Sequence, residues 1–314
     1  CMHFMLSRIA TIDIFVAFFI ILAYYYLYRY FLADHKYRQT SECLSDPFPP
    51  FRVAVLLALC GIGMSLAIAT KLTGVYAAAG LAILFIWYTI LHFPKQQTLR
   101  LFLFCIGFFV ILPLVLYTLA YIPVVGADGY NGLIDKNTRY MLWYHSTLKA
   151  EHYYSSPYYE WPVIWMPLLD ANDAVSATKV SAVSCMGNPA IWWVGIPCVL
   201  ITFIQWIARR DGKAGFLTIG YLAQYLPWVI LGLSGGRITF IYHYFPAILF
   251  VILMMGYTIN CIIHRFSWGK KAVTIYLAAA VIVFFLFFPV VSGFPIDREL
   301  GMKLRWLKDW ILIL

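Results

Sequence analysis

Long apolar runs recur along this chain of 314 residues, and they constrain its fold more than any other feature. Most of the runs approach about twenty residues, enough for a helix to cross roughly 30 Å of hydrocarbon. Apolar residues make up 63% of the sequence and charged residues only 12%. Because a helix satisfies its backbone polar groups within one segment, the sequence predicts an all-α, polytopic transmembrane bundle. The eight predicted spans cover residues 9–31, 53–70, 73–92, 101–121, 190–208, 215–233, 238–263 and 272–292.

Lys and Arg are divided unevenly between the loops on the two sides of this bundle. One set of alternate loops carries 12 cations and four acids, a balance of +8, and the other carries 11 cations and 10 acids, a balance of +1. Since cationic loops stay in the cytoplasm, the 122–189 loop and the C-terminal tail are predicted to face the periplasm or exterior of a cell membrane. The net charge of +9 reflects this orientation. We expect membrane lipids, and no nucleic acid, among the partners.

The spans divide the chain into three regions. Residues 1–121 hold four spans, residues 122–189 form an external loop with short helices, and residues 190–314 hold four more spans and an outward-facing tail. The tail from Trp306 to Leu314 fits either an interfacial helix or a frayed apolar end. The chain begins at Cys1 without an initiator Met or a signal-peptide layout, which indicates an N-terminally truncated fragment.

The external loop contains a polar and aromatic segment, HYYSSPYYEWPVIWMP, at residues 152–167. Within it lie His152, Glu160, two serines and a high density of tyrosine and tryptophan rings. A connecting loop has no packing need for so many rings and hydrogen-bonding groups. Rings that stack and polar groups that orient suit the binding of sugars, glycolipid head groups or extended peptides at a membrane surface.

Three places put a charge where burial in lipid would be costly, at about 2.5–3.5 kcal/mol each at a span's centre. Arg8 and Asp13 open the first span. Either Arg8 snorkels while Asp13 pairs inside the bundle, or Asp13 orients Arg8 to bind an anionic group. Lys71 is the only charge between Val53 and Leu91. It marks a turn at the outer face, where it either snorkels or meets a lipid phosphate.

The third place is the segment SGGRITFIYHYFP at residues 234–246. Arg237 follows a Gly-Gly turn that lets the backbone approach a ligand, and its guanidinium can bind phosphate through two nitrogens. His243 lies among tyrosines, where a lone histidine is more often a core residue than a catalyst. Arg237 is therefore the stronger candidate.

Arg8, Lys71 and Arg237 share one predicted depth, so we expect them to converge with His152 on a single cavity at the outer face. A lipid that carries a phosphate and a sugar is the simplest ligand for such a cavity. The seven cysteines are scattered and form no Cys/His cluster with metal spacing. We therefore expect no metal site and no cofactor, and the sequence leaves the metal requirement of the reaction open.

At these residues the sequence resembles the protein O-mannosyltransferases that use a polyprenyl (dolichyl-type) phosphate-mannose donor. The segments that carry the resemblance are SRIATIDIFVAFF, GMSLAIATKLTGVYAAAG, HYYSSPYYEWPVIW, MGNPAIWWVG, IGYLAQYLPW and RITFIYHYFPA. They occur in the family's order and span about three-quarters of the chain, from residue 7 to 247.

The resemblance implies an inverting glycosyltransferase of the GT-C type, which moves mannose from the lipid phosphate to a Ser or Thr hydroxyl of an acceptor protein. It implies that Lys71 and Arg237 stabilise the leaving phosphate. His152 and Glu160 lie in the matching loop segment. The candidate substrate-binding residues are Arg8, Lys71, His152, Glu160, Arg237 and His243, with Asp13 in an orienting role.

Two departures from the family pattern limit this assignment. The family's catalytic aspartate belongs to an Asp-Glu pair in an external loop that precedes the segment matching Ser7-Arg8. The catalytic base is therefore not assigned here, and the fragment alone is expected to be inactive. Eukaryotic members also insert a β-trefoil domain, for which the 68-residue loop at 122–189 leaves no room. The sequence thus favours a bacterial enzyme.

Two other functions are compatible with the same spans. Another GT-C enzyme could use a lipid-phosphate sugar with a lipid acceptor, although the HYYSSPYYEWP and MGNPAIWW segments favour the protein acceptor. A non-catalytic lipid-binding or transport protein is the second alternative. Transporters tend to place charges at the membrane midplane and to contain inverted repeats. Here the charges gather at one predicted face, and no repeat is visible.

Overall fold

The computed structural model describes residues 1–40, 49–92, 95–124, 133–147, 150–234 and 237–314. Among them are eight helices long and apolar enough to cross a membrane, which confirms the predicted fold class of a polytopic helical membrane protein. These helices cover Asp13–Gln39, Phe51–Thr70, Gly74–His92, Leu99–Leu119, Pro189–Arg209, Gly212–Leu233, Ile241–Arg265 and Gly269–Ser292. Residue contacts divide the chain into two compact units, Ile12–Tyr144 and a second unit that joins Cys1–Thr11 to His145–Leu314.

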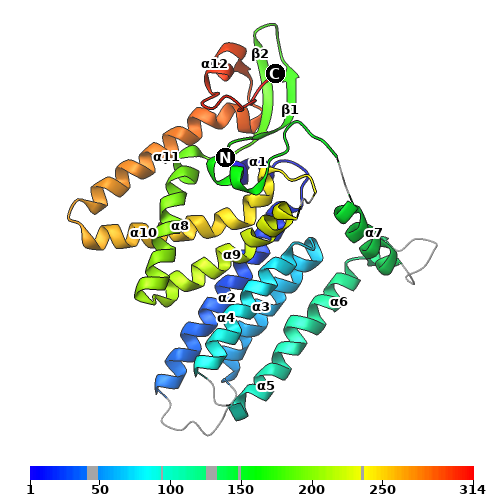
Figure 1. Cartoon of the computed structure of the whole chain (residues 1–314), viewed down its shortest axis with the longest axis vertical. Coiled ribbons are helices and arrows are strands. Elements are labelled where there is room, and N and C mark those ends of the chain that lie inside the picture. The colour runs from blue at the N-terminus through cyan, green and yellow to red at the C-terminus, as the bar shows by residue number, and fades with distance from the viewer. Residues whose placement is uncertain (41–48, 93–94, 125–132, 148–149, 235–236) are drawn as a thin grey trace. The chain divides into compact units, whose positions relative to one another are not determined.

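The Ile12–Tyr144 unit contains the first four spans and the helix that follows them (Figure 1). Its elements are α2 (Asp13–Thr40), α3 (Phe51–Thr70), α4 (Gly74–His92), α5 (Lys95–Ile106), η1 (Gly107–Ile111), α6 (Leu112–Leu119), η2 (Ile122–Val124) and most of α7 (Leu133–Thr147). Small residues let the helices approach closely. A Cβ on Gly63 would lie 3.1 Å from the backbone nitrogen of Ala23, so α2 and α3 touch almost backbone to backbone there.

The fourth span is continuous but irregular, because α5 and α6 are joined by the wider π-helical turn η1. Pro113 lies at the start of α6 and has no N–H to donate to the preceding turn. A proline at this position accounts for the local change in helix geometry. This span is the least buried of the eight. Only 11% of its apolar stretch is buried inside the protein, so most of its side chains are available to lipid.

The second unit contains the last four spans and the segments that cap one end of them. Its elements are α1 (Met2–Leu6), η3 (Tyr158–Val163), β1 (Leu168–Ala174), β2 (Lys179–Cys185), α8 (Pro189–Arg209), α9 (Gly212–Leu233), η4 (Ile241–Tyr244), α10 (Phe245–Arg265), α11 (Gly269–Ser292), β3 (Ile296–Asp297) and α12 (Arg298–Lys303).

Polar side chains define where these spans begin. Asn188 caps α8, because its side-chain oxygen accepts from the N–H of Ala190 at 2.9 Å. Its amide nitrogen also donates to the carbonyl of Ala280 in α11 at 2.9 Å. Asp211 caps α9 through the N–H groups of Lys213 and Ala214. The conspicuous MGNPAIWW segment is thus, in large part, a helix start.

A small antiparallel sheet, with strand order β1-β2-β3, was not expected from the sequence, which predicted only short helices in the 122–189 loop. Val180, Ala182 and Ser184 alternate along β2 and are fully buried, which is the period of a strand with one covered face. Ser181 donates to the carbonyl of Gly293, just after α11, at 2.7 Å. The signal in the sequence is only three buried positions long, and the partner surface lies more than a hundred residues away.

The C-terminal tail matches neither of the two alternatives left open by the sequence. After α12 the chain is irregular but packed, with Trp310, Leu312 and Ile313 at most 2% exposed. The Trp310 indole donates to the carbonyl of Ile164 at 2.6 Å, and Ser184 donates to the carbonyl of Leu312 at 3.0 Å. The tail therefore completes the cap around η3 and the sheet.

Candidate functional site

Two segments far apart in the sequence are joined side by side in the second unit. The Ser156 N–H donates to the Thr239 carbonyl at 2.9 Å, and the Thr239 hydroxyl donates to the Ser156 carbonyl at 2.8 Å. This reciprocal pair ties the aromatic loop to the turn that precedes α10. Tyr158, two residues further on, packs against α9 so closely that a Cβ on Gly232 would lie 2.6 Å from its ring.

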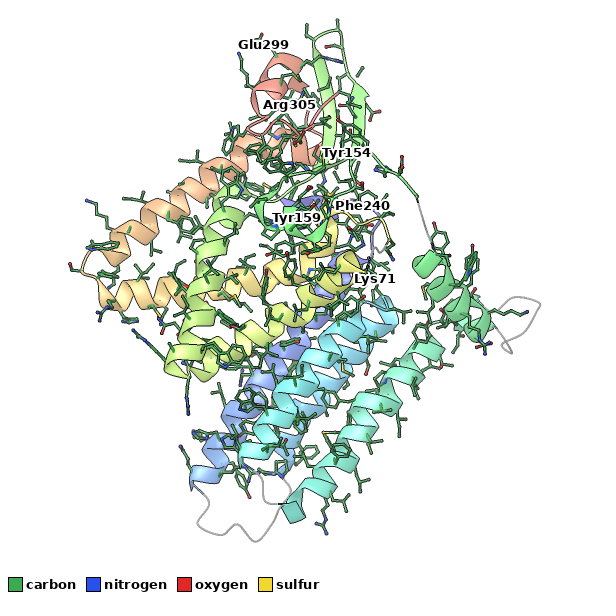
Figure 2. All side chains as sticks on the ribbon, viewed as in Figure 1. Lys71, Tyr154, Tyr159, Phe240, Glu299 and Arg305 are labelled. Carbon is green, nitrogen blue, oxygen red and sulfur yellow. The ribbon has the colours of Figure 1, made fainter. Side chains whose placement is uncertain are left out.

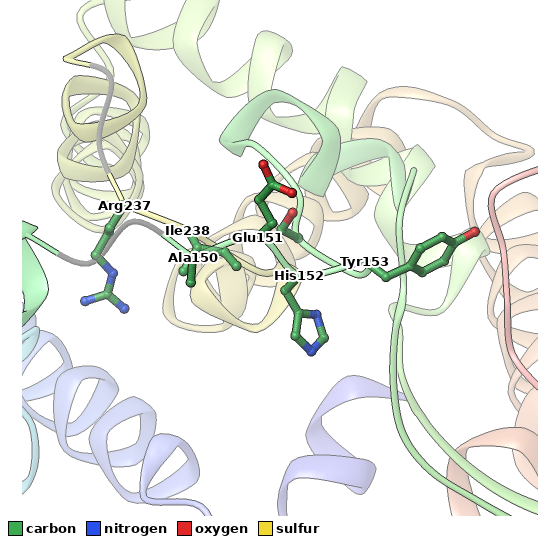
Figure 3. A pocket seen from close by; sticks show the side chains of 7 residues that line it. Ala150, Glu151, His152, Tyr153, Arg237 and Ile238 are labelled. Carbon is green, nitrogen blue, oxygen red and sulfur yellow. The ribbon is translucent and has the colours of Figure 1, made fainter.

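An open cavity of about 550 Å³ lies where these two segments meet (Figure 3). From the loop side it is lined by Ala150, Glu151, His152, Tyr153 and Ser155, and from the turn by Arg237 and Ile238. Figure 3 shows the side chains of His152 and Arg237 directed to the same side of the loop, with Glu151 directed to the other. The structure thus brings together two of the side chains that the sequence predicted to share a cavity.

The Arg237 guanidinium has the features of an anion-binding group. Its Nη2 lies 3.4 Å from Nε2 of His243, and its Nε–H is buried with no hydrogen-bond partner among the residues that the structure describes. None of the ion pairs found among the described residues involves Arg237. A buried donor without an acceptor is costly, so a ligand that supplies anionic oxygens would satisfy it.

His152 presents a donor at the same cavity. The Tyr154 N–H donates to its Nδ1 at 3.2 Å, so in the neutral ring the proton resides on Nε2. The ring is exposed on one side and meets Phe240 edge to face, with centroids 5.2 Å apart. The Phe240 ring therefore supports one side of the imidazole. The Nε2–H of His152 can donate to an oxygen of a bound ligand.

His243 lies behind Arg237, and it does not line the cavity. Its side chain is 5% exposed and packs against Trp228 and Trp161. Trp161 is fully buried and donates its indole N–H to both the carbonyl and the hydroxyl of Ser156, at 3.1 Å each. A buried aromatic layer therefore lies behind Arg237, outside the cavity lining.

Lys71 and Asp13 form an ion pair of 2.7 Å within the Ile12–Tyr144 unit. Asp13 is the first residue of α2 and Lys71 directly follows α3, at the end of the helix where Figure 2 labels it. Each charge thus also complements its own helix dipole. A Cβ on Gly74 would lie 2.6 Å from the carbonyl carbon of Ala67, so the turn after Lys71 requires a glycine.

Arg8 has a different set of contacts from the one the sequence suggested. Its Nη1 donates to the carbonyl of Ser292, the last residue of α11, at 2.8 Å, and its guanidinium lies 5.4 Å from the ring centre of Phe4. A cation at the C-terminus of a helix stabilises the exposed carbonyls there. Arg8 is not among the residues that line the cavity.

Comparison with known proteins identifies the family. The family model described as the C-terminal four TMM region of protein-O-mannosyltransferase matches residues 134–310, more than half of the chain. The model described as dolichyl-phosphate-mannose-protein mannosyltransferase matches residues 1–125. The chain belongs to the protein O-mannosyltransferase family. Together the two matches cover nearly all of the sequence, including every candidate residue of the site.

Curated relatives in this mannosyltransferase family are similar at a moderate level. The polyprenol-phosphate-mannose–protein mannosyltransferase of Mycobacterium tuberculosis (strain CDC 1551 / Oshkosh) is 25% identical, over 80% of this chain and 56% of the relative. The Corynebacterium glutamicum protein of the same name is 23% identical, over 97% of this chain and 68% of the relative. The chain thus spans little more than half the length of the first of these relatives.

A solved structure of the family is also similar. It is the Saccharomyces cerevisiae protein O-mannosyltransferase Pmt1-Pmt2 complex bound to the sugar donor. The identity is 23% and the TM-score 0.49, and the match covers 60% of this chain and 29% of that chain.

The two loop glutamates of this mannosyltransferase-family chain occupy different places. Glu160, the one selected from the sequence, lies in η3 outside the cavity lining, and burial together with the nearby Asp309 carboxylate raises the pKa of its side chain. Glu151 lines the cavity, but the sequence did not predict it as a site residue. The only feature of the sequence that points to Glu151 is its position directly before His152. Within the described part of the chain, no three His, Cys, Asp or Glu side chains gather as metal ligands.

Proposed function

We propose that this protein transfers mannose from a polyprenyl-phosphate-mannose lipid to Ser or Thr hydroxyls of an acceptor protein, with inversion at the anomeric carbon. The Arg237 guanidinium carries the proposal, because its buried Nε–H lacks an acceptor beside an open polar cavity. Membership of the protein O-mannosyltransferase family supports the donor and the acceptor class. The names of curated relatives point to the same donor.

The chemistry assigns a clear task to a fixed cation. In the transfer, the bond between the anomeric carbon and the phosphate oxygen breaks, and its electron pair leaves with the phosphate. The acceptor oxygen forms the new bond to that carbon and loses its proton to a base. Negative charge therefore grows on the phosphate oxygens, where Arg237 acts chiefly on the transition state. His152 Nε2–H can donate to another oxygen of the same ligand.

Lys71 and Arg8 have separate places in the proposal. The family resemblance is what assigns Lys71 to the donor phosphate as a second cation; within its own unit the ammonium pairs with Asp13 at 2.7 Å. We assign Arg8 a structural role at the C-terminal end of α11, since its Nη1 donates to the Ser292 carbonyl. No cofactor enters this reaction, because a glycosyl phosphate is already activated for transfer.

A direct transfer assay tests the reaction. Membranes from cells that express the full-length protein to which this chain belongs are incubated with radiolabelled polyprenyl-phosphate-mannose and a Ser/Thr-rich acceptor polypeptide, and the same full-length protein carries every variant assayed below. We expect label in the polypeptide that is released by alkali, as an O-linked sugar on Ser or Thr is. Label that appears only in the lipid fraction would favour a lipid acceptor, and binding of the donor without any transfer would favour a lipid-binding protein.

The orientation of the chain follows from the distribution of Lys and Arg, and we propose that the cavity faces the periplasm or exterior. Tyr153, in the external loop, and Lys213, at the start of α9, lie on opposite sides of this topology, and both are exposed. We expect a cysteine at Tyr153 to react with an impermeant maleimide in intact cells, and a cysteine at Lys213 to react only after lysis. The reverse pattern would exclude the proposed orientation.

A further inference from the structure

We infer that His243 and Trp161 are positioning residues, which hold the Arg237 guanidinium in the orientation that an anion requires. The inference rests on the proposed role of Arg237 and assigns His243 no contact with substrate. His243 is 5% exposed and is absent from the cavity lining. His243 can affect a ligand only indirectly, through the 3.4 Å contact between its Nε2 and Nη2 of Arg237.

The contacts of His243 fit two tautomers. With the proton on Nδ1, the ring donates to the Phe240 carbonyl at 3.0 Å, and its Nε2 can accept from Nη2 of Arg237. With the proton on Nε2, Nδ1 accepts from the Phe240 N–H at 3.1 Å, and the contact with Arg237 is not a hydrogen bond. We assign the first tautomer, in which His243 is an acceptor for Arg237, because it satisfies two of the three contacts.

The ring of His243 is surrounded by three other rings. It stacks on Tyr242 with centroids 4.4 Å apart, meets Trp228 edge to face with centroids 4.3 Å apart, and lies nearly parallel to Trp161 at 6.0 Å. Such packing disfavours other rotamers of the His243 ring. The acceptor that Arg237 meets is therefore fixed in place before any ligand arrives.

Trp161 connects this stack to the opposite wall of the cavity. Its indole N–H donates to Ser156, and Ser156 is paired with Thr239, two residues from Arg237. The buried layer that contains Trp161 and Ser156 therefore fixes the position of both the loop that carries His152 and the turn that carries Arg237. A free arginine side chain would lose rotamer entropy on binding phosphate, whereas a pre-oriented one loses less.

Replacement of the His243 ring tests the positioning role. His243→Phe keeps an aromatic ring and removes the acceptor, and His243→Gln restores an acceptor oxygen. For His243→Phe we expect the donor KM to rise by roughly tenfold, the scale of one lost hydrogen bond to a charged group. The acceptor KM should be unchanged, and His243→Gln should recover most of the loss. Trp161→Phe, which keeps an aromatic ring but removes the indole N–H and some volume, should show a smaller rise in the donor KM.

Repetition of these changes in an Arg237→Ala background decides how His243 acts. If it acts through Arg237, His243→Phe has no further effect on the donor KM there. A further rise in that background would mean that His243 contacts the donor itself, which overturns the inference. If Arg237→Ala alone leaves the donor KM unchanged, the proposed role of Arg237 fails instead. Where His243→Phe does not accumulate in membranes, Trp161→Phe replaces it in the same two backgrounds. A rise in the donor KM that disappears in the Arg237→Ala background supports the inference, and an unchanged donor KM in the parent background overturns it.

Discussion

Arg237→Ala is expected to lower the efficiency of donor use by roughly ten- to hundredfold, because a hydrogen bond to a charged group contributes about 1.5–3 kcal/mol. Arg237→Lys should recover only part of the loss. Lysine keeps the charge but cannot reproduce the planar, two-nitrogen contact with phosphate. The measurement is the transfer rate as a function of polyprenyl-phosphate-mannose concentration, at a fixed concentration of acceptor polypeptide.

Arg8→Ala provides a matched control for the loss of one guanidinium from the same compact unit. Its contact with the Ser292 carbonyl is structural, so we expect a lower thermal stability and a nearly unchanged donor KM. Equal effects of the two substitutions on the donor KM would show that the cavity responds to overall charge. In that case the specific role of Arg237 would be lost.

The sequence predicted the spans well because their signal is local. A run of apolar residues has to be long enough to cross the bilayer, and each segment reports this by itself. The predicted span at 215–233 corresponds to α9 at Gly212–Leu233, and the one at 73–92 to α4 at Gly74–His92. The largest difference is α2, which continues to Thr40 because its polar end remains helical.

The small sheet and the packed tail escaped prediction because their stability comes from distant partners. Ser184 donates to Leu312, and Trp310 donates to Ile164, across more than a hundred residues in each case. No local pattern encodes such a contact. The burial of Trp310 follows from the cap that surrounds it, whereas its sequence neighbours resemble an interfacial segment.

The candidate site was predictable in part. A costly arginine beside Gly-Gly and a histidine in an aromatic loop were both visible in the sequence, and they line one cavity in the structure. Glu151 was not predicted, because a glutamate beside a histidine is ordinary in an external loop. The arrangement of His243 was also not visible, since the direction of a hydrogen bond depends on three-dimensional contacts.

In the full-length enzyme, Lys71→Met is expected to reduce the efficiency of donor use by roughly ten- to hundredfold, with little loss of protein from the membrane. The reason is that the leaving phosphate carries more charge than one guanidinium neutralises. The methionine keeps most of the volume of the lysine stem, so packing at the α3–α4 turn should persist. The donor dependence of the transfer rate and the amount of inserted protein are measured together.

The Lys71–Asp13 ion pair supplies the competing explanation, and a double-mutant cycle separates the two. If the lysine serves only the fold, Asp13→Asn should impair transfer as much as Lys71→Met, and the double variant should be no worse than either. If the lysine serves the phosphate, Asp13→Asn leaves the ammonium in place and should have the smaller effect. In that case Asp13→Asn is expected to leave donor use unchanged or improved, because the ammonium no longer has to exchange a carboxylate for the ligand. Equal losses in both single variants would therefore restrict Lys71 to a structural role, with Arg237 as the cation that carries the proposed phosphate contact.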